Sequence, residues 1–510
     1  SYDLTAGTSR SGAPAVPGVP AAPAAADTAW SVQYINADKV WSQLGYTGAG
    51  VVVGHIDTGI WLTHPDLASR LWINADEIPG NGIDDDVNGF IDDVNGWDFG
   101  DDDNDPNDDS GDPGHGTHTA GTVAGDGTGG TLTGVAPGAR LIAAKVWQDS
   151  GAGGSLAMIW AAQQYCVENG ARILTMSLGI PGDIAPYFMR NERYNCDNIR
   201  NAGVVFFTSA GNDHYLYSPP IELSLTARVP PPWLPEGYPY SSTGGVITVG
   251  GTGYKNDFIY SASSRGPANW GNVEPWNDWP YLPGPGLIKP DVAVPGVSVN
   301  STIIPSGYSG DTWNGTSMAC PHAAGVAALM MEKNPTLSPA GVDSIMEYWA
   351  VDLGAPGKDN DCGAGRLDAL NSVAATPVTE APDLHWTEFY ADPSGDGVLD
   401  PGETSEAAFQ LRNSNPYVDA TGTNGSLTVV PNPYVSVAKN SGTFPTIPAG
   451  GGVGDNLAYP FSLAVDAAAP QGYEFEMRLT VTSGWYFQKT FDIVGRVGLP
   501  DYRTHEVGDI

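Results

Sequence analysis

Between Trp30 and about Val373, short apolar runs alternate with stretches of helical periodicity. The runs that we predict to be buried strands are VVVGHID (51–57), RLIAAKV (140–146), RILTMSL (172–178), GVVFFTSA (203–210) and GVITVGG (245–251). Helix-like segments such as GTHTAGTVA, SLAMIWAAQQYCVENG and CDNIRNAG lie between them. Alternating strands and helices predict a doubly wound α/β fold, with a mostly parallel sheet covered on both faces. In such a sheet, functional groups gather at the carboxyl ends of the strands.

The pattern changes at ATPVTEAPD (375–383), beyond which the apolar segments have strand character and no helical period. These segments are LHWTEFY, EAAFQLR, GSLTVV, YEFEMRLTVTS and WYFQKTFDIVG. We therefore expect an α/β domain over residues 30–376 and a smaller all-β sandwich, jelly-roll-like, over 383–497. Residues 1–29 are rich in proline and alanine and are interpreted as a linker or propeptide remnant, and residues 498–510 as a tail.

The net negative charge of the chain limits the kinds of molecule that it is expected to bind. The 510-residue chain carries a formal charge of −36, from 58 acidic and 22 basic residues. Such a surface repels phosphate backbones, so nucleic acid is not an expected partner, whereas divalent cations or saline surroundings fit it. No apolar run approaches the ~20 residues that span a bilayer, and no signal peptide is visible.

The four cysteines allow up to two disulfides in three pairings. Cys166 and Cys196 lie on neighbouring helical segments and are therefore candidates to pair. Cys320 follows a serine by one helical turn, where a small buried thiol is the ordinary expectation. Cys362 stands in the last part of the α/β region.

Three short motifs supply an acid, an imidazole and a hydroxyl. Asp57 ends the strand in HIDTGI, His115 opens a helix in GHGTHTAGT, and Ser317 stands in NGTSMACPH. Each has an ordinary alternative: a turn residue for Asp57, a packing residue for His115 and a helix cap for Ser317. Together they form the set that nucleophilic catalysis needs, in which the imidazole takes the serine proton and the carboxylate orients the imidazole.

The motifs D-T-G, H-G-T-H-x-A-G-T and G-T-S-M-A-x-P-H resemble the signatures of the subtilisin-like serine peptidases (subtilases), and the likeness extends over about residues 30–374. The chain order Asp, His, Ser is the subtilisin order. The resemblance implies that Asp57 is the orienting acid, His115 the general base and Ser317 the nucleophile. His118 is then a structural neighbour. Asn212 of SAGN corresponds to the family's side-chain oxyanion donor, although an asparagine beside glycine is also an ordinary turn residue.

Two stretches match the family's substrate-binding edges. The first is Gly151, Ala152, Gly153 and Gly154, and the second is Ser177, Leu178 and Gly179. Glycines allow a substrate backbone to approach closely and to add as a strand, although a flexible loop is the alternative for residues 151–154. Because hydrogen bonds to the substrate backbone depend little on the substrate's side chains, we expect broad specificity for protein or peptide substrates.

An acidic loop over residues 74–112 spaces oxygen donors as a calcium-binding EF-hand loop does. The expected ligands are Asp84, Asp86, Asn88, Phe90 and Asp92, with Gly89 at the turn. Asn95 stands where the bidentate glutamate belongs, so that ligand must come from elsewhere. A solvated acidic loop without an ion is the alternative.

A second loop matches the twelve-residue calcium pattern more completely. Its expected ligands are Asp392, Ser394, Asp396, Val398, Asp400 and Glu403. Asp66, with Asp27, is a further candidate because an acid there binds calcium in many subtilases. Thr128, however, replaces the asparagine usual in the partner loop, and this third site stays open.

We therefore expect a secreted, calcium-stabilised serine endopeptidase that holds two or more structural ions and acts as a monomer. A surface or adhesion protein that retains an inactive subtilase fold is the main alternative, and covalent labelling of the serine separates the two. A processing protease that cuts one partner is the narrower alternative, and cleavage-site profiling tests it.

Overall fold

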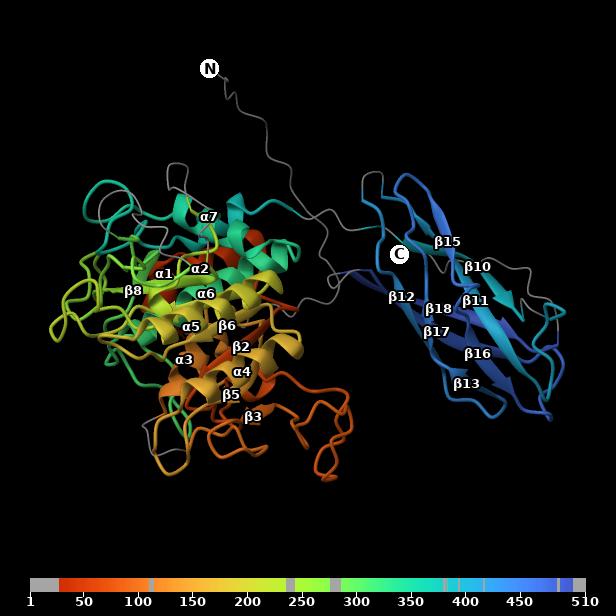
Figure 1. The fold of residues 1–510 in the computed structure, drawn as a ribbon. Helices are drawn as coiled ribbons and strands as arrows, with labels where there is room; N and C mark the ends of the chain where they lie inside the picture. The colour runs from red at the N-terminus through yellow and green to blue at the C-terminus, as the bar shows by residue number, and fades with distance from the viewer. Residues whose placement is uncertain are drawn as a thin grey trace, which may run out of the picture. The chain divides into compact units, whose positions relative to one another are not determined.

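The computed structural model describes residues 27–109, 114–234, 244–275, 286–378, 382, 384–392, 395–415, 418–483 and 487–498. The chain divides into two compact units, Ser1–Pro377 and Val378–Ile510 (Figure 1). The predictions for most of the first 29 residues, for the tail after residue 498 and for Ser394 lie outside the described residues.

A seven-stranded parallel sheet forms the centre of the first unit. Its strands, in spatial order, are β3 (Gly96–Asp98), β5 (Arg140–Lys145), β2 (Val52–Asp57), β6 (Ile173–Met176), β7 (Val205–Ser209), β8 (Val246–Thr252) and β9 (Val292–Pro295). A separate short pair joins β1 (Asp27–Thr28) to β4 (Thr131–Leu132). After β2 the chain forms β3 and then β5 on one side of β2, and afterwards β6 to β9 on the other side. The strand order therefore reverses beside β2.

Helices cover the sheet, as Figure 1 shows. They are α1 (Trp30–Tyr34), α2 (Ala37–Lys39), α3 (His115–Ala124), α4 (Leu156–Glu168), α5 (Pro186–Asn201), α6 (Thr316–Lys333), α7 (Pro339–Tyr348) and α8 (Ala369–Ala375). A π-helical turn spans Val40–Leu44, and 3-10 turns span Ala68–Arg70 and Thr226–Arg228. The predicted α/β fold class is confirmed.

The five predicted strands all form, whereas the two edge strands β3 and β9 were not predicted. Both are short, so neither gives a sustained apolar run. Helix α5 begins at Pro186 instead of the predicted Cys196, because Glu192 and Arg193 are buried on its inner face and interrupt the apolar period.

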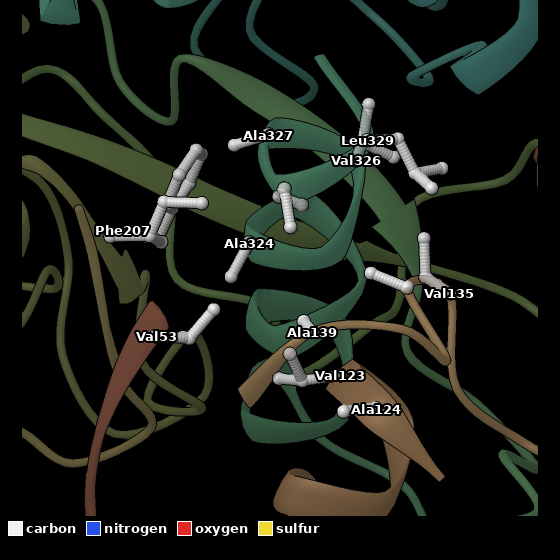
Figure 2. Packing of buried hydrophobic residues seen from close by; sticks show 14 of the residues in the cluster. Val53, Val123, Ala124, Val135, Ala139, Phe207, Ala324, Val326, Ala327 and Leu329 are labelled. Atoms are coloured by element: carbon white, nitrogen blue, oxygen red, sulfur yellow. The ribbon is translucent and has the colours of Figure 1, made fainter. Parts of the chain in front are cut away.

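Helix α6 is buried on nearly every side, which is why its sequence shows no polar stripe. Figure 2 shows residues of this helix packed among side chains from several elements, including Val53 of β2 and Phe207 of β7. Small residues allow the close approach: a Cβ at Gly325 would lie 2.5 Å from the Cβ of Val135. This packing fixes the start of α6 at the carboxyl edge of the sheet.

All four cysteines lie among the described residues, and all are free and buried. The candidate Cys166–Cys196 disulfide is therefore not formed. Cys166 packs against Gly54, where an added Cβ would lie 2.8 Å from the sulfur, and Cys196 donates to Glu192 at 3.8 Å. Cys320, bonded to the Met176 carbonyl, is the small buried thiol expected at that position.

Two antiparallel sheets make up the second unit. One contains β10 (Leu384–Ala391), β11 (Thr404–Asn413), β16 (Phe461–Val465) and β13 (Val435–Lys439), with β15 (Val453–Asp455) paired to β11. The other contains β14 (Ser441–Thr443), β12 (Asn424–Val429), β17 (Glu474–Ser483) and β18 (Phe487–Arg496). Alternate residues of β17 are buried, as expected for a strand with one face on a core. Both sheets contribute to one apolar cluster, consistent with the predicted β-sandwich.

Candidate active site

Asp57 and His115 meet at the carboxyl edge of the sheet. Asp57 is the last residue of β2 and is buried, and His115 is the first residue of α3. His115 Nδ1 lies 2.6 Å from Asp57 Oδ1, which also accepts a bond from the N–H of Thr58 at 2.8 Å. Because Nδ1 is engaged by the carboxylate, Nε2 is the ring nitrogen on which a base would act.

A second layer of hydrogen bonds surrounds Asp57. Thr119 Oγ1 donates to Asp57 Oδ2 at 3.1 Å, and His55 Nε2 lies 2.8 Å from Thr119 Oγ1. Burial alone raises the pKa of Asp57, but the charge and hydrogen bond of His115 outweigh it, and the net pKa lies below the ordinary value. Asp57 is therefore ionised at neutral pH. Sequence reasoning missed the supporting role of Thr119.

Burial distinguishes His115 from three other histidines that stand in or beside the sequence motifs. Burial lowers the pKa of His55 to about 4, of His118 to about 3 and of His322 to about 4, so these three are neutral. His118 stacks on Trp313 with ring centroids 4.4 Å apart. The His115 side chain is 21% exposed and can reach a substrate. His115 is thus the more exposed of the two histidines in the HGTH motif, and its role as the base stays a prediction.

Ser317 is the second residue of α6 and is half-buried. Its backbone N–H belongs to the first helical turn, where N–H groups have no partner within the helix and the helix dipole is positive. The Ser317 Oγ donates to the carbonyl of Ser177 at 3.2 Å. A negative oxygen near this turn would be stabilised.

A proline inside α6 ties Ser317 to the end of β6. Pro321 has no N–H, so the Ser317 carbonyl lacks its helical donor four residues on. Ser177 Oγ donates to that carbonyl at 2.8 Å instead. The two serines thus exchange a pair of hydrogen bonds.

Asn212 approaches the same helix start from the segment after β7. Its Oδ1 accepts bonds from Thr316 N at 2.9 Å and from Thr316 Oγ1 at 3.2 Å. A backbone N–H must face the amide oxygen, so the orientation of the side chain is defined and Nδ2 is the group left to donate. Asn212 is exposed, and Gly211 before it has a φ of 112°, which favours glycine.

The two predicted substrate edges occupy different settings. Gly151, Ala152, Gly153 and Gly154 are all exposed and precede α4. A Cβ at Gly154 would lie 2.1 Å from the Val146 carbonyl oxygen, so only glycine fits there. Ser177, Leu178 and Gly179 follow β6, and a Cβ at Gly179 would lie 2.5 Å from Ser224. The structure brings Ser177 to Ser317.

The first predicted calcium loop gathers some of its expected ligands and adds one. Carboxylate oxygens of Glu77, Asp84 and Asp86 lie within 4.8 Å of one another, a separation that a calcium ion could bridge. Glu77 is buried and precedes the twelve-residue pattern, so pattern matching missed it. Asp92 is not part of this group, and its two oxygens accept the N–H groups of residues 81 and 82. The Asn88 Oδ1 accepts from the N–H of Phe90 at 2.7 Å.

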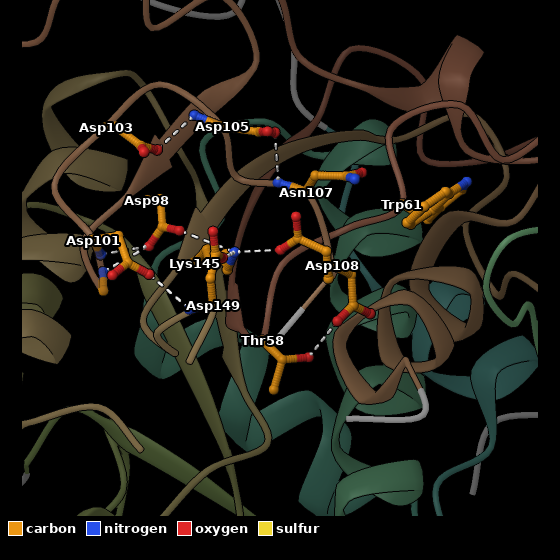
Figure 3. Close-up of polar contacts among 12 residues, drawn as sticks. Thr58, Trp61, Asp98, Asp101, Asp103, Asp105, Asn107, Asp108, Lys145 and Asp149 are labelled. Atoms are coloured by element: carbon orange, nitrogen blue, oxygen red, sulfur yellow. Dashed lines mark hydrogen bonds and ion pairs between the residues drawn. The ribbon is translucent and has the colours of Figure 1, made fainter. Parts of the chain in front are cut away.

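A buried lysine neutralises the next part of the acidic segment. Lys145, at the end of β5, donates to Asp98 at 3.0 Å and to Asp109 at 2.8 Å, and also contacts Asp149 (Figure 3). These ion pairs raise the pKa of Lys145 despite the opposing effect of burial. Asp98, Asp101 and Asp149 have metal-like spacing, but the Lys145 ammonium already binds two of them.

The second predicted loop shows local turns instead of a gathered set. Asp392 Oδ2 accepts from Asp396 N at 3.1 Å, and Glu403 Oε2 accepts from Ser405 Oγ at 3.2 Å. Gly397 has a φ of 86°, as the glycine of a calcium loop requires. Among the described residues, no three carboxylates of this loop converge.

Asp66, the third candidate, already has donors from the protein. Its Oδ2 accepts from Tyr308 Oη at 2.8 Å, and its Oδ1 accepts from the N–H of Gly129. Asp27 pairs with Thr131 in the neighbouring two-stranded ladder. Within the described chain, no helix has the length and apolar character that crossing a bilayer demands.

Comparison with known proteins gives the family. The model of the Subtilase family matches residues 48–365. Subtilisin DY from Bacillus licheniformis is 34% identical over 333 residues, covering 65% of this chain and 94% of that protein. Serine protease AprX from Bacillus subtilis (strain 168) is 32% identical over 357 residues (64% and 67%), and Subtilisin Savinase from Lederbergia lenta is 31% identical over 355 residues (69% and 100%). The family match ends before the second unit. The chain therefore belongs to the Subtilase family and is a serine endopeptidase.

Proposed function

We propose that Ser317 is the nucleophile, His115 the general base and Asp57 the acid that orients His115. In this scheme His115 Nε2 takes the proton as Ser317 Oγ attacks the peptide carbonyl, and the resulting imidazolium protonates the leaving amine. Water then releases the acyl-enzyme by the same proton transfers. The observation that carries the proposal is the 2.6 Å contact between buried Asp57 and partly exposed His115.

We propose that the oxyanion forms between Asn212 Nδ2 and the Ser317 backbone N–H. The Thr316 bonds that orient the Asn212 amide support this role, because a preorganised donor stabilises developing charge without moving. Substrate is proposed to lie between residues 151–154 and 177–179 as an added strand. Since both segments offer mainly backbone groups, we propose broad specificity, which a peptide-library cleavage profile tests.

Labelling of the serine tests the catalytic assignment. A phosphonofluoridate should label Ser317 in the parent, and Ser317→Ala should lose casein hydrolysis and labelling while its circular dichroism and melting temperature persist. Full activity of Ser317→Ala, or labelling elsewhere, would reject the assignment. A parent that is folded but unlabelled would favour the inactive surface protein.

Calcium stabilisation is a separate proposal. Glu77, Asp84 and Asp86 form the best-supported ligand group of the first loop. The spacing of the sequence alone supports Asn88, Phe90 and Asp92 as further ligands there, and residues 392–403 as the second loop. Bound calcium would supply positive charge to a surface of high negative charge. Loops of this kind in extracellular proteins bind calcium at about 10⁻⁴–10⁻³ M, which fits a further proposal that the enzyme is secreted. We also propose that it is a monomer. Calorimetry with calcium tests ion binding, and light scattering tests the monomeric state.

A further inference from the structure

Helix α3, which carries His115, cannot cap its own first turn. Its N-cap residue is Gly114, which has no side chain, and no side chain of the cap residue bonds the helix. Thr58 Oγ1 accepts the N–H of Gly116 at 2.8 Å, and Asp108 Oδ2 accepts the N–H of Thr117 at 2.8 Å. Both acceptors therefore come from other segments of the chain.

A single buried carboxylate joins these two contacts. Asp108 Oδ1 accepts a hydrogen bond from Thr58 Oγ1 at 2.9 Å (Figure 3), and Asp108 Oδ2 accepts one from Thr117 Oγ1 at 2.6 Å. Thr58 directly follows Asp57, and Thr117 lies two residues after His115. Asp108 thus bonds to the chain beside both members of the proposed acid–base pair. Its side chain is 0% exposed, and burial raises its pKa to about 6 against the opposing hydrogen bonds of Thr117 and Thr58.

Close backbone packing makes this bridge rigid. A Cβ at Gly116 would lie 2.1 Å from the carbonyl oxygen of Gly59, so helix and strand end touch only because residue 116 is glycine. A Cβ at Gly59 would lie 2.8 Å from the carbonyl oxygens of Pro106 and Asn107. The segment before Asp108 therefore packs directly on the loop after β2.

We infer that Asp108 is a positioning residue for the Asp57–His115 pair: its carboxylate fixes the end of β2 relative to the start of α3. The inference rests on the proposed roles of Asp57, His115 and Ser317. Asp108 does not touch the reacting atoms. A displacement of about 1 Å in such a site costs about 10²-fold in rate, whereas loss of a purely structural helix cap costs about 0.5–2 kcal/mol of stability and leaves the rate alone.

Two variants at Asp108 separate positioning from capping. Asp108→Ala should lower kcat by about 10- to 100-fold on a small peptide anilide, with KM within about twofold, because only the alignment of the pair changes. Asp108→Asn keeps an acceptor oxygen and should recover a substantial part of kcat. The low-field proton resonance of the His115 Nδ1–H in its bond to Asp57 should shift or weaken in Asp108→Ala and return in Asp108→Asn.

Glu332→Ala is the matched control. Glu332 Oε2 also accepts backbone N–H groups, from Thr47 and Gly48 at 2.6 Å each, but it lies near the far end of α6 from Ser317. This variant should lose stability and keep the parental kcat. A comparable loss of kcat in Glu332→Ala would mean that destabilisation alone explains the Asp108 effect.

A kcat of Asp108→Ala within twofold of the parent, or a change confined to KM, would overturn the inference. If neither Asp108 variant folds, Thr58→Val, which deletes the link from Asp108 to β2, must show the kcat loss and the altered resonance or the inference fails. The serine assignment is judged independently: a labelled parent and an inactive Ser317→Ala stand even if Asp108→Ala is fully active.

Discussion

Ser177 and Ser317 exchange hydrogen bonds between the end of β6 and the first turn of α6. Ser317 Oγ donates to the Ser177 carbonyl, and Ser177 Oγ donates to the Ser317 carbonyl, which Pro321 has deprived of a helical donor. The proline therefore leaves an acceptor that Ser177 satisfies. This exchange links the proposed nucleophile to one of the proposed substrate edges.

Ser177→Ala should leave the Ser317 carbonyl unsatisfied. We expect a loss of about 0.5–1.5 kcal/mol in the free energy of unfolding, the contribution of an ordinary hydrogen bond to a partly buried acceptor, together with a lower kcat. Denaturant titration and kinetics on a peptide anilide measure the two effects. Ser42→Ala, at an exposed serine bonded to Asp38, is the control and should change stability by less than about 0.5 kcal/mol. Parental stability of Ser177→Ala would contradict the role of the exchange.

Asn212→Ala should lower kcat by about 10²–10³-fold with little change in KM, a magnitude established for a subtilisin oxyanion donor. Asn212→Asp separates donation from orientation, because it keeps the oxygen that accepts from Thr316 but has no N–H. We expect Asn212→Asp to fold normally and to be at least as slow as Asn212→Ala in stopped-flow or steady-state assays. Near-parental activity of the aspartate variant would exclude a donor role.

The buried histidines should make folding stability sensitive to acid. The folded pKa of His322, about 4, lies below the 6.5 of an unfolded imidazole, so between these values the unfolded chain binds a proton that the native chain does not. This stabilising contribution is fully present above pH 6.5 and declines as the pH falls toward 4. His322→Asn keeps a donor for the Met318 carbonyl and should reduce the slope of unfolding free energy by about 1.4 kcal/mol per pH unit in this window. Urea titrations from pH 4.5 to 7.5 check this, and an unchanged slope would contradict it.

Chelation should lower the melting temperature, and Glu77→Gln should weaken the response to calcium. Calcium at about 100 times its dissociation constant adds about 2.7 kcal/mol of stability when it binds only the native state. Because the carboxylate of Glu77 converges with those of Asp84 and Asp86 and that of Asp92 does not, Glu77→Gln should reduce the calcium-dependent shift more than Asp92→Asn. Differential scanning calorimetry with calcium or EDTA measures the shift. The reverse ranking would support the EF-hand assignment of Asp92 over that of Glu77.

Lys145→Met should destabilise the first unit by about 3–5 kcal/mol, because it leaves Asp98 as a buried charge without a cation. The companion change Asp98→Asn in the same background should restore part of the loss. Lys39→Met, at an exposed lysine bonded to Asn36, is the control. Guanidinium titration of the single and double variants tests the pairing, and full additivity would show that Lys145 and Asp98 do not interact.

The sequence predicted the central strands and the candidate residues because both leave local signals. A fully buried strand such as β2 is a continuous apolar run, and Asp57, His115 and Ser317 stand inside short glycine-containing motifs. The edge strand β3 and the first half of α5 lack such a signal. In α5, tertiary contacts bury Glu192 and Arg193, and these charges hide the helical period.

Residues that act through another element escaped sequence reasoning. Glu77 joins the carboxylate group from outside the twelve-residue spacing, and Asp108 stands in a run of acids whose composition does not tell which one is buried. Thr58, Thr119 and Thr316 are ordinary threonines until the fold brings them to Asp108, Asp57 and Asn212, respectively. Their roles depend on long-range packing, which local pattern does not encode.

The lysine at the end of β5 gives the acidic segment a counter-charge of a different kind from that of the proposed calcium ion. A calcium ion can be withdrawn by a chelator, whereas the ammonium of Lys145 is covalently part of the sheet and stays with Asp98 and Asp109. Asp109 is the neighbour of Asp108, so the stretch beside the helix that carries His115 keeps its anchor when ions are stripped away. In such an enzyme, chelation would loosen the turns around Glu77 before it disturbed the alignment of Asp57 with His115.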